Sequence, residues 1–309
     1  MFPGQGLFIL REMLFTQGMK LILRWMGAAV FAAVLAVNAA DAGTGASFKG
    51  PLGLQLYSLR ADFAQNVELA LDKVQEFGFK EVELAGTYNM PAEKFLEMLK
   101  KRGLTAVSGH FPYARFKSEP EKVAQEAKAL GLKFAGCAWA DHKTRGKYTM
   151  EEAKEAARVF NAAGKALKKE GIQFFYHCHG FEFAPTGSGD ETFMDIMIKD
   201  TDKNDVTFEM DVFWVVHPGH DPAKWLEKYP GRWQLMHVKD MKKGTKTGDF
   251  SGGTDVRNDV AIGTGQMDWP TILKAAQKNG VKYYFIEDEA PTVKEQIPVS
   301  LKYLSEVKF

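Results

Sequence analysis

The hydrophobic pattern divides most of the chain into short apolar runs that alternate with longer amphipathic segments. A nearly continuous apolar run is typical of a strand buried on both faces, and apolar residues three or four apart are typical of a helix packed on a sheet. The predicted strands are residues 52–58, 79–84, 104–109, 132–138, 174–183, 206–212, 233–239 and 282–288. The predicted helices are residues 62–77, a segment from about 91, residues 120–130, 149–169 and 222–228, a segment from about 269, and residues 292–307.

Glycine follows several of these helices just before the next strand, at Gly78, Gly103, Gly131, Gly171 and Gly280. This position is typical of a helix end, where glycine adopts the left-handed conformation easily. Eight strand-helix units in about 260 residues predict a (β/α)8 barrel, the TIM-barrel fold. The alternative is a doubly wound open sheet, which usually carries a glycine-rich phosphate turn after an early strand. Residues 52–60 contain no such turn.

Polar side chains gather at the ends of the predicted strands, where the active site of such a barrel lies. In chain order they are Tyr57 and Arg60; Glu83; His110; Trp139; His177, His179 and Glu182; Glu209 and Asp211; His237, Lys239 and Asp240; and Glu287 and Glu289. Each residue alone could make an ordinary local hydrogen bond. Polar ends on eight apolar strands together indicate a shared site. Because side chains alternate with period two along a strand, we expect His177 and His179 to point the same way.

Imidazole and carboxylate groups on strands five to eight are the ligand types that suit Mn²⁺, Co²⁺, Zn²⁺, Mg²⁺ or Fe²⁺. The sequence therefore predicts one divalent metal ion, whose identity stays open. Neither a G-x-S-x-G nucleophile elbow nor a Walker lysine loop is present in the sequence.

At these positions the chain resembles the sugar phosphate isomerase/epimerase family, also described as the xylose isomerase-like TIM barrels of the AP endonuclease 2 superfamily. The resemblance covers residues 50–309. Its motifs are residues 55–60 (QLYSLR), 83–86 (ELAG), 176–183 (YHCHGFEF), 209–214 (EMDVFW), 237–240 (HVKD), 262–269 (IGTGQMDW) and 285–289 (FIEDE). The resemblance implies a (β/α)8 barrel with one divalent metal bound by side chains from strands five to eight.

The resemblance implies Asp211, His237 and Glu287 as metal ligands. The ligand from strand five is His177 or Glu182, because the commonest family pattern has a glutamate where His177 stands. The remaining predicted roles divide into two groups. Glu287, His179 and Glu182 are the candidate catalytic groups, and Tyr57, Glu83, His110, Trp139, Trp214 and Lys239 are the candidate substrate contacts.

This set of residues suits proton abstraction next to a carbonyl, with a metal stabilising the enediolate. We predict a sugar isomerase or epimerase that acts on a free ketose or keto-sugar. A 3-keto-glycoside lyase or hydratase with the same metal site is an alternative, and a non-catalytic periplasmic sugar-binding barrel is another. The intact Asp211, His237 and Glu287 weigh against a pure binder. An AP endonuclease is disfavoured because the formal net charge is only +1, and a nucleic-acid partner is not expected.

Residues 1–45 are predicted to be a signal peptide with a short exported segment, and the barrel domain is residues 46–309. A basic region from Met19 to Arg24 precedes an apolar stretch and small residues, with cleavage expected after Ala39 or Ala42. The apolar stretch is shorter than the ~20 residues of a membrane span, although a non-cleaved anchor is the alternative. These features predict a periplasmic or secreted protein with no membrane attachment after cleavage.

Export would determine which sugars the protein meets and whether its cysteines are in an oxidising compartment. Phosphorylated sugars are largely cytosolic, so the expected partner is an unphosphorylated small-molecule sugar; a homo-oligomer is left open. Cys137 and Cys178 are the two cysteines of the chain. We predict two buried free thiols, although an oxidising compartment would permit them to pair.

Overall fold

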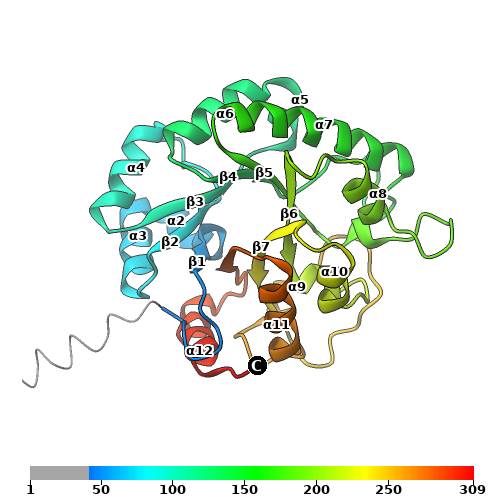
Figure 1. Cartoon of the computed structure of the whole chain (residues 1–309). Coiled ribbons are helices and arrows are strands. Elements are labelled where there is room, and N and C mark those ends of the chain that lie inside the picture. The colour runs from blue at the N-terminus through cyan, green and yellow to red at the C-terminus, as the bar shows by residue number, and fades with distance from the viewer. Residues whose placement is uncertain (1–41) are drawn as a thin grey trace, which may run out of the picture. The chain divides into compact units, whose positions relative to one another are not determined.

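The computed structural model describes residues 42–309, which form a closed barrel of parallel strands surrounded by helices (Figure 1). Around the barrel the strands follow the order β1-β10-β7-β6-β5-β4-β3-β2. Their bounds are β1 Leu52–Gln55, β2 Glu81–Leu84, β3 Thr105–His110, β4 Phe134–Cys137, β5 Gln173–His177, β6 Val206–Asp211, β7 Trp233–Val238 and β10 Tyr283–Ile286. This closed order confirms the predicted TIM barrel and excludes the open sheet.

The helices lie outside the barrel and pack on its strands (Figure 1). The longer ones are α3 Val67–Glu76, α4 Ala92–Lys101, α6 Pro120–Ala129, α7 Met150–Lys169, α11 Trp269–Asn279 and α12 Val293–Glu306. The shorter ones are α2 Arg60–Gln65, α5 Tyr113–Ser118, α8 Phe193–Lys199, α9 Val212–Val216 and α10 Pro222–Lys228. Helix α7 begins at a capping box in which the Thr149 and Glu152 side chains bond each other's backbone N–H. The predicted helix 62–77 is two helices, because Asn66 ends α2 and caps α3 through Leu69 N–H.

Strand five is shorter than predicted. The expected strand covered residues 174–183, but β5 ends at His177 and the 3₁₀ turn η2 occupies Phe181–Phe183. Gly180 has a φ of 93°, a left-handed conformation that turns the chain out of the strand. His179 therefore lies beyond the strand, and the turn rather than strand alternation brings its ring to 4.8 Å from that of His177.

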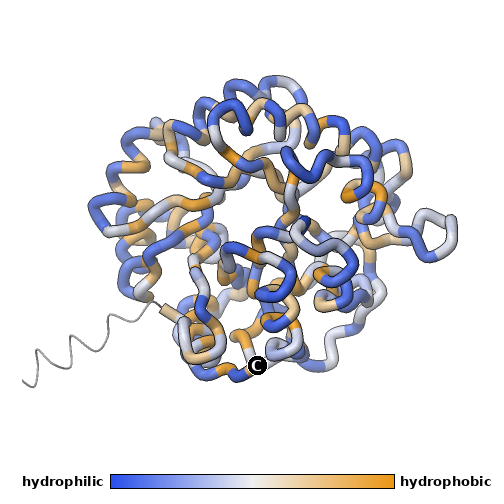
Figure 2. The backbone as a smooth tube through the Cα atoms, in the orientation of Figure 1, coloured by the Kyte–Doolittle hydropathy of each residue, from blue (hydrophilic) through white to orange (hydrophobic). Residues whose placement is uncertain are grey.

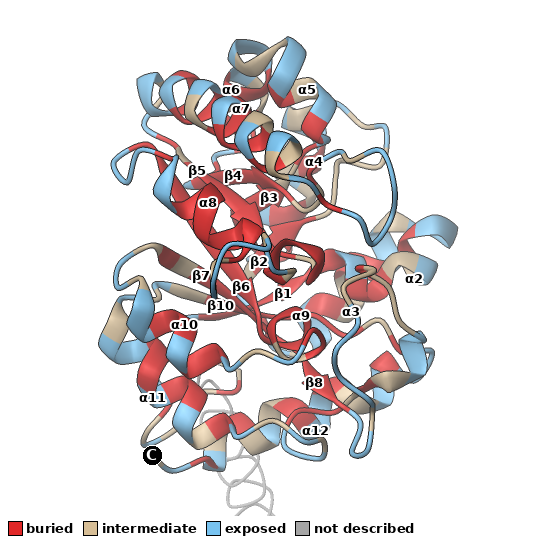
Figure 3. Ribbon diagram, turned by 90° about the vertical axis from the view of Figure 1, so that its right-hand side faces the viewer, coloured by how far each residue is buried: buried red, intermediate tan, exposed pale blue. Residues whose placement is uncertain are grey.

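Two apolar layers hold the barrel together. Outside it, the apolar faces of the helices pack on the strands, while polar residues cover the outer surfaces (Figures 2 and 3). Inside it, Phe175 and Phe285 are fully buried and belong to a small cluster of their own. Glycine makes room for Phe175, because a Cβ at Gly136 would lie 2.0 Å from Phe175 O. The ring of Phe175 lies 5.3 Å from that of His110, so the aromatic layer reaches the polar strand ends.

The segment before β1 packs on the barrel. A Cβ at Gly45 would lie 1.9 Å from Ser305 O of α12, and Phe48 is buried edge-on against Tyr284 at 5.0 Å. Residues 1–41, with most of the predicted signal peptide, lie outside the described residues. Within residues 42–309 no helix combines the length and apolarity required to cross a membrane. Cys137 and Cys178 are both buried and free, as predicted.

The loop after β7 carries a second, two-stranded sheet that the hydrophobic pattern did not predict. Strands β8 (Asp240–Met241) and β9 (Asp259–Val260) pair antiparallel at the base of the loop, and the 3₁₀ turn η3 (Val256–Asn258) precedes β9. Asp240 accepts hydrogen bonds from Gly263 N–H and from Trp269 Nε1–H, 2.8 and 2.9 Å away. Asp240 therefore fastens this loop rather than facing the other strand ends.

Candidate active site

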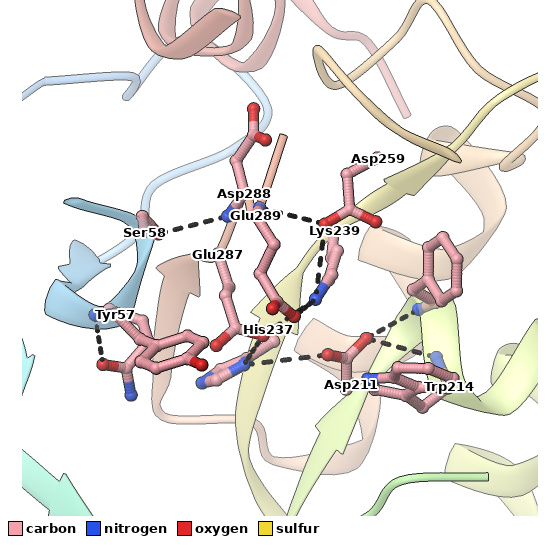
Figure 4. A network of polar contacts seen from close by, with 12 residues as sticks. Tyr57, Ser58, Asp211, Trp214, His237, Lys239, Asp259, Glu287, Asp288 and Glu289 are labelled. Atoms are coloured by element: carbon pink, nitrogen blue, oxygen red, sulfur yellow. Dashed lines mark hydrogen bonds and ion pairs between the residues drawn. The ribbon is translucent and has the colours of Figure 1, made fainter. Parts of the chain in front are cut away.

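Four of the predicted residues form a compact group at the carboxyl ends of the strands. His177 ends β5, Asp211 ends β6, His237 lies near the end of β7, and Glu287 directly follows β10. One ligand atom from each lies within 4.8 Å of the others, and all four residues are buried. Figure 4 shows Asp211, His237 and Glu287 converging from three strands.

The Asp211 carboxylate is fixed by one oxygen and free at the other. Asp211 Oδ1 accepts hydrogen bonds from Phe213 N–H and Trp214 N–H, at 2.8 and 3.2 Å, and so caps α9. Asp211 Oδ2 is buried without a hydrogen-bond partner, 3.8 Å from both His177 Nε2 and His237 Nδ1. A buried carboxylate oxygen without a partner is unfavourable unless a cation compensates it. Burial accordingly raises the pKa of Asp211 to about 7.

Each imidazole of the group turns one ring nitrogen toward a second carboxylate and the other toward Asp211. His177 Nδ1 lies 2.9 Å from Glu209 Oε2, and His237 Nε2 lies 2.6 Å from Glu83 Oε1. The opposite nitrogens, His177 Nε2 and His237 Nδ1, face Asp211, and His237 Nδ1 also lies 3.3 Å from Glu287 Oε2. This is the arrangement that metal-ligating histidines make with carboxylates in known metal sites. The donors therefore fit one divalent metal ion held by His177, Asp211, His237 and Glu287.

A second group of potential ligands overlaps the first and consists of His110, His177, Glu209 and His237. It uses the other ring nitrogens of the two shared histidines. Those nitrogens already face a carboxylate oxygen, because Glu209 Oε2 lies 2.9 Å from His177 Nδ1 and 3.2 Å from both His110 Nε2 and His237 Nε2. Ring N–H groups therefore satisfy Glu209 Oε2, whereas Glu209 Oε1 and Asp211 Oδ2 are both buried without a partner. The geometry favours the group with Asp211, because its free oxygen faces the two ring nitrogens that do not contact Glu209.

Glu83 is not placed for the predicted contact with a substrate. Its side chain is fully buried, and it accepts hydrogen bonds from Gln55 Nε2–H and the Ser108 hydroxyl besides facing His237. His110 lies between Glu83 and Glu209, with Nε2 3.2 Å from a carboxylate oxygen of each. Burial disfavours the charged form of His110, but the two carboxylates outweigh burial and raise its pKa to about 10. Glu83 thus contacts the ligand candidate His237, and His110 joins Glu83 to Glu209.

Glu182 has partners that remove it from the metal group. Both of its carboxylate oxygens accept from His179 N–H, at 3.0 and 3.1 Å, and the Tyr176 hydroxyl donates to one of them. Glu182 belongs to neither group of potential ligands, so the geometry favours His177 as the ligand from strand five. Burial raises the pKa of Glu182 to about 7. Glu182 thus holds the turn that carries His179 in place, and its predicted catalytic role stays a prediction.

His179 lies between two tryptophans. Its ring stacks on Trp214 with centroids 5.5 Å apart and meets Trp139 edge-on at 5.3 Å. His179 Nδ1 is buried and has no hydrogen-bond partner. Burial lowers the pKa of His179 to about 3, so the ring is a neutral base at ordinary pH.

Lys239 and the rim complete the site. Lys239 Nζ is buried and lies 3.1 Å from Glu287 Oε2, 2.6 Å from Glu289 Oε1 and 3.5 Å from Asp259 Oδ2 (Figure 4). Burial opposes the charge of Lys239, but these carboxylates raise its pKa well above the ordinary value.

At the rim, Tyr57 is 45% exposed and lies under the Arg60 guanidinium. Figure 4 shows the Tyr57 ring on the side of Glu287 and His237.

Sequence reasoning missed Asp259, Gln55 and Ser108 as parts of the polar network. Asp259 comes from the irregular loop after β7, where no hydrophobic period marks a strand. Gln55 is the last residue of β1, and Ser108 lies within β3, two residues before His110. The period-two rule applied to those two strands could have placed both side chains inside the barrel.

A (β/α)8 barrel with imidazoles and carboxylates gathered at its strand ends has the architecture of a TIM-barrel active site. Within that class, the chain belongs to the family of xylose isomerase-like TIM barrels, whose family model matches residues 71–307. The inosose dehydratase of Clostridium perfringens is 25% identical over 271 residues, which cover 78% of this chain and 89% of that protein. These similarities identify the chain as an enzyme rather than a non-catalytic sugar-binding barrel.

Solved structures are also similar to this chain and support its place in this family. A sugar phosphate isomerase/epimerase from Parabacteroides distasonis is 26% identical with a TM-score of 0.68, and the match covers 86% of this chain and 97% of that one. The IolI protein, whose crystal structure contains a zinc atom, has a TM-score of 0.62 at 14% identity over 81% of this chain and 95% of its own. At that identity the likeness shows the fold alone.

Proposed function

We propose that this enzyme removes water from an uncharged keto-sugar or keto-polyol with the help of one divalent metal ion. The observation that carries the proposal is the unpartnered Asp211 Oδ2, which lies 3.8 Å from two imidazole nitrogens. Imidazole and carboxylate donors suit Mn²⁺, Co²⁺, Zn²⁺ or Mg²⁺, and the zinc atom of the IolI structure is consistent with this assignment. When bound, such an ion polarises a carbonyl oxygen and stabilises the charge that develops as a neighbouring proton leaves.

His179 is the group that moves the proton in this proposal. Its ring is neutral and partly exposed, and the flanking Trp139 and Trp214 hold the ring in place. The His179 ring accepts the proton from the carbon next to the carbonyl, and the C–H electron pair becomes the new C=C bond as the β C–O bond breaks. His179 returns the proton to the departing hydroxyl, which leaves as water. The relative named inosose dehydratase supports this outcome.

The charge of the site argues for an uncharged substrate. Lys239 is already surrounded by the carboxylates of Glu287, Glu289 and Asp259. Arg60 donates to Glu289 O at 2.8 Å and lies 3.9 Å from Glu289 Oε2. Neither cation is thus available for a phosphate group, whereas hydroxyl groups can bond the carboxylates. Trp139 and Trp214 offer flat surfaces to the apolar face of a sugar ring.

Isomerisation or epimerisation is the second candidate. It would begin with the same proton abstraction but return the proton to carbon, and the Parabacteroides distasonis relative supports it. An epimerase of the two-base type requires a second base besides His179, and Glu287 is the remaining candidate because Glu182 is bonded to His179 N–H and Tyr176. The two outcomes differ in their products, since only elimination changes the mass of the substrate by one water.

The test is incubation with Mn²⁺ and a panel of inososes, 3-keto-glucosides and ketoses in D₂O, followed by mass spectrometry. We expect loss of water from a panel member, abolished by Asp211→Asn and retained in Asp195→Asn, a buried aspartate of α8 outside the site. Deuterium gain at carbon without loss of water would favour the epimerase. If no panel member exchanges deuterium or loses water, the proposal is wrong.

Export is a second part of the proposal, supported by the basic, apolar and small-residue regions of residues 19–42. The periplasm or the exterior of the cell then supplies the unphosphorylated substrate. N-terminal sequencing of the protein from a fractionated bacterial host tests this. Cleavage after Ala39 or Ala42 in the exported fraction is expected, and an intact N-terminus in the cytosolic fraction would contradict it.

A further inference from the structure

We infer that Glu83 and Glu209 are positioning residues that select which ring nitrogens of His237 and His177 face the metal. This inference rests on the proposed metal site. Its starting point is a buried network beneath the four ligands, and none of its members is a ligand itself. We call this network the carboxylate floor and define it as Glu83, His110 and Glu209.

The floor is connected to both histidine ligands. Glu209 Oε2 lies 2.9 Å from His177 Nδ1, and Glu83 Oε1 lies 2.6 Å from His237 Nε2. Both carboxylates are fully buried, so water does not compete for these bonds. A neutral imidazole carries its proton on either ring nitrogen, and the nitrogen that faces a carboxylate becomes the donor. His177 Nδ1 therefore donates to Glu209, which leaves the lone pair of His177 Nε2 free beside the unpartnered Asp211 oxygen. At His237 both nitrogens face a carboxylate, but the 2.6 Å contact of Nε2 with Glu83 is shorter than the 3.3 Å contact of Nδ1 with Glu287 Oε2, itself a proposed metal ligand. Nε2 is therefore the donor to Glu83, and Nδ1 faces the proposed ligands.

The floor is itself held rigidly. Gln55 Nε2 donates to Glu83 Oε1 at 2.7 Å, and the Ser108 hydroxyl donates to Glu83 Oε2. His110 Nε2 lies 3.2 Å from Glu83 Oε1 and 3.2 Å from Glu209 Oε2 and thus joins the two carboxylates. The donors come from β1 and β3, while the ligands come from β5 to β10. Strands that carry no proposed metal ligand thereby fix the orientation of the ligands.

Glu83 and Glu209 reach the proposed metal only through the imidazoles, so their removal should weaken metal binding in variants that remain folded. Loss of an outer carboxylate partner of a metal-bound histidine typically weakens metal binding 10- to 100-fold. Glutamine keeps the size of the side chain and one acceptor oxygen but loses the charge, whereas leucine loses both. We therefore expect Glu209→Gln to weaken binding about 10-fold and Glu209→Leu about 100-fold, with the same order at Glu83.

The experiment measures Co²⁺ binding to the whole protein by competition with a chelator, together with the visible absorption spectrum of bound Co²⁺. The variants are Glu83→Gln, Glu209→Gln, Glu83→Leu and Glu209→Leu, and the control is Asp195→Asn. We expect graded losses of affinity, a changed Co²⁺ spectrum in the glutamine variants, and wild-type binding in the control. Thermal melting checks folding, and where a leucine variant does not fold the isosteric glutamine variant decides.

Two failures can be told apart. If the wild type binds no Co²⁺, the proposed metal site is wrong. If the wild type binds Co²⁺ and both glutamine variants keep its affinity and spectrum, the inference about the carboxylate floor is overturned while the metal site stands.

Discussion

Replacing Lys239 by methionine would show how strongly this site depends on a buried cation. Its ammonium group lies within 3.5 Å of oxygens of Glu287, Glu289 and Asp259. At 3.1 Å and an effective dielectric constant of about 20, the attraction to Glu287 alone is about 5 kcal/mol. Desolvation of the ammonium offsets a large part of this gain. Removal of one partner nevertheless leaves buried carboxylates uncompensated, and we expect a loss of about 3–5 kcal/mol in the free energy of unfolding.

The assay is urea unfolding of Lys239→Met and wild type in EDTA, so that bound metal does not contribute to either. The matched control is Lys73→Met, which removes a partly exposed lysine paired with Glu76 on α3. An exposed pair contributes about 0–1 kcal/mol, so the control should remain close to wild type. If Lys239→Met lowers the free energy of unfolding by less than about 1 kcal/mol, as little as the Lys73→Met control, the reasoning is wrong. Lys239→Arg should recover part of the loss because the positive charge remains.

Three further predictions concern the scaffold. Asp195, which accepts hydrogen bonds from Thr192 and the Tyr229 hydroxyl, has its pKa lowered: burial opposes the shift, and these donors with Lys228 outweigh burial. Its stabilisation is therefore present above the unfolded pKa of about 3.9 and is lost as pH falls through the lower folded pKa. Thermal melts should separate wild type from Asp195→Asn at pH 7, and the difference should shrink as pH falls below about 3.9; a constant difference would contradict this. Phe175→Ala empties a fully buried position in the barrel and should cost about 3–5 kcal/mol in urea unfolding, whereas a cost under about 1 kcal/mol would mean that the barrel interior collapses around the cavity. Thr149→Ala removes the capping box of α7 and should cost about 1 kcal/mol, with no loss expected if the cap is dispensable.

The prediction of the fold succeeded because it depends on local patterns. Apolar runs and glycine helix ends mark each strand-helix unit independently, and eight such units match the size of a barrel. The same periodicity placed His177, Asp211, His237 and Glu287 at strand ends, and the structure brings these four together. The pattern failed where the chain leaves regular structure. Strand β5 ends at His177, before His179, and the chain turns at Gly180. Asp259 comes from a loop that shows no hydrophobic periodicity.

The sequence by itself determined the barrel and which strand ends carry imidazoles and carboxylates, because strand and helix periods are properties of neighbouring residues. Only the tertiary structure decided what each polar group does. Glu83 and His237 are 154 positions apart, yet their 2.6 Å contact orients the His237 ring. Glu182 turns back to bond His179 N–H instead of joining the ligands. Such roles depend on which nitrogen or oxygen a distant strand satisfies, and barrel closure fixes that choice.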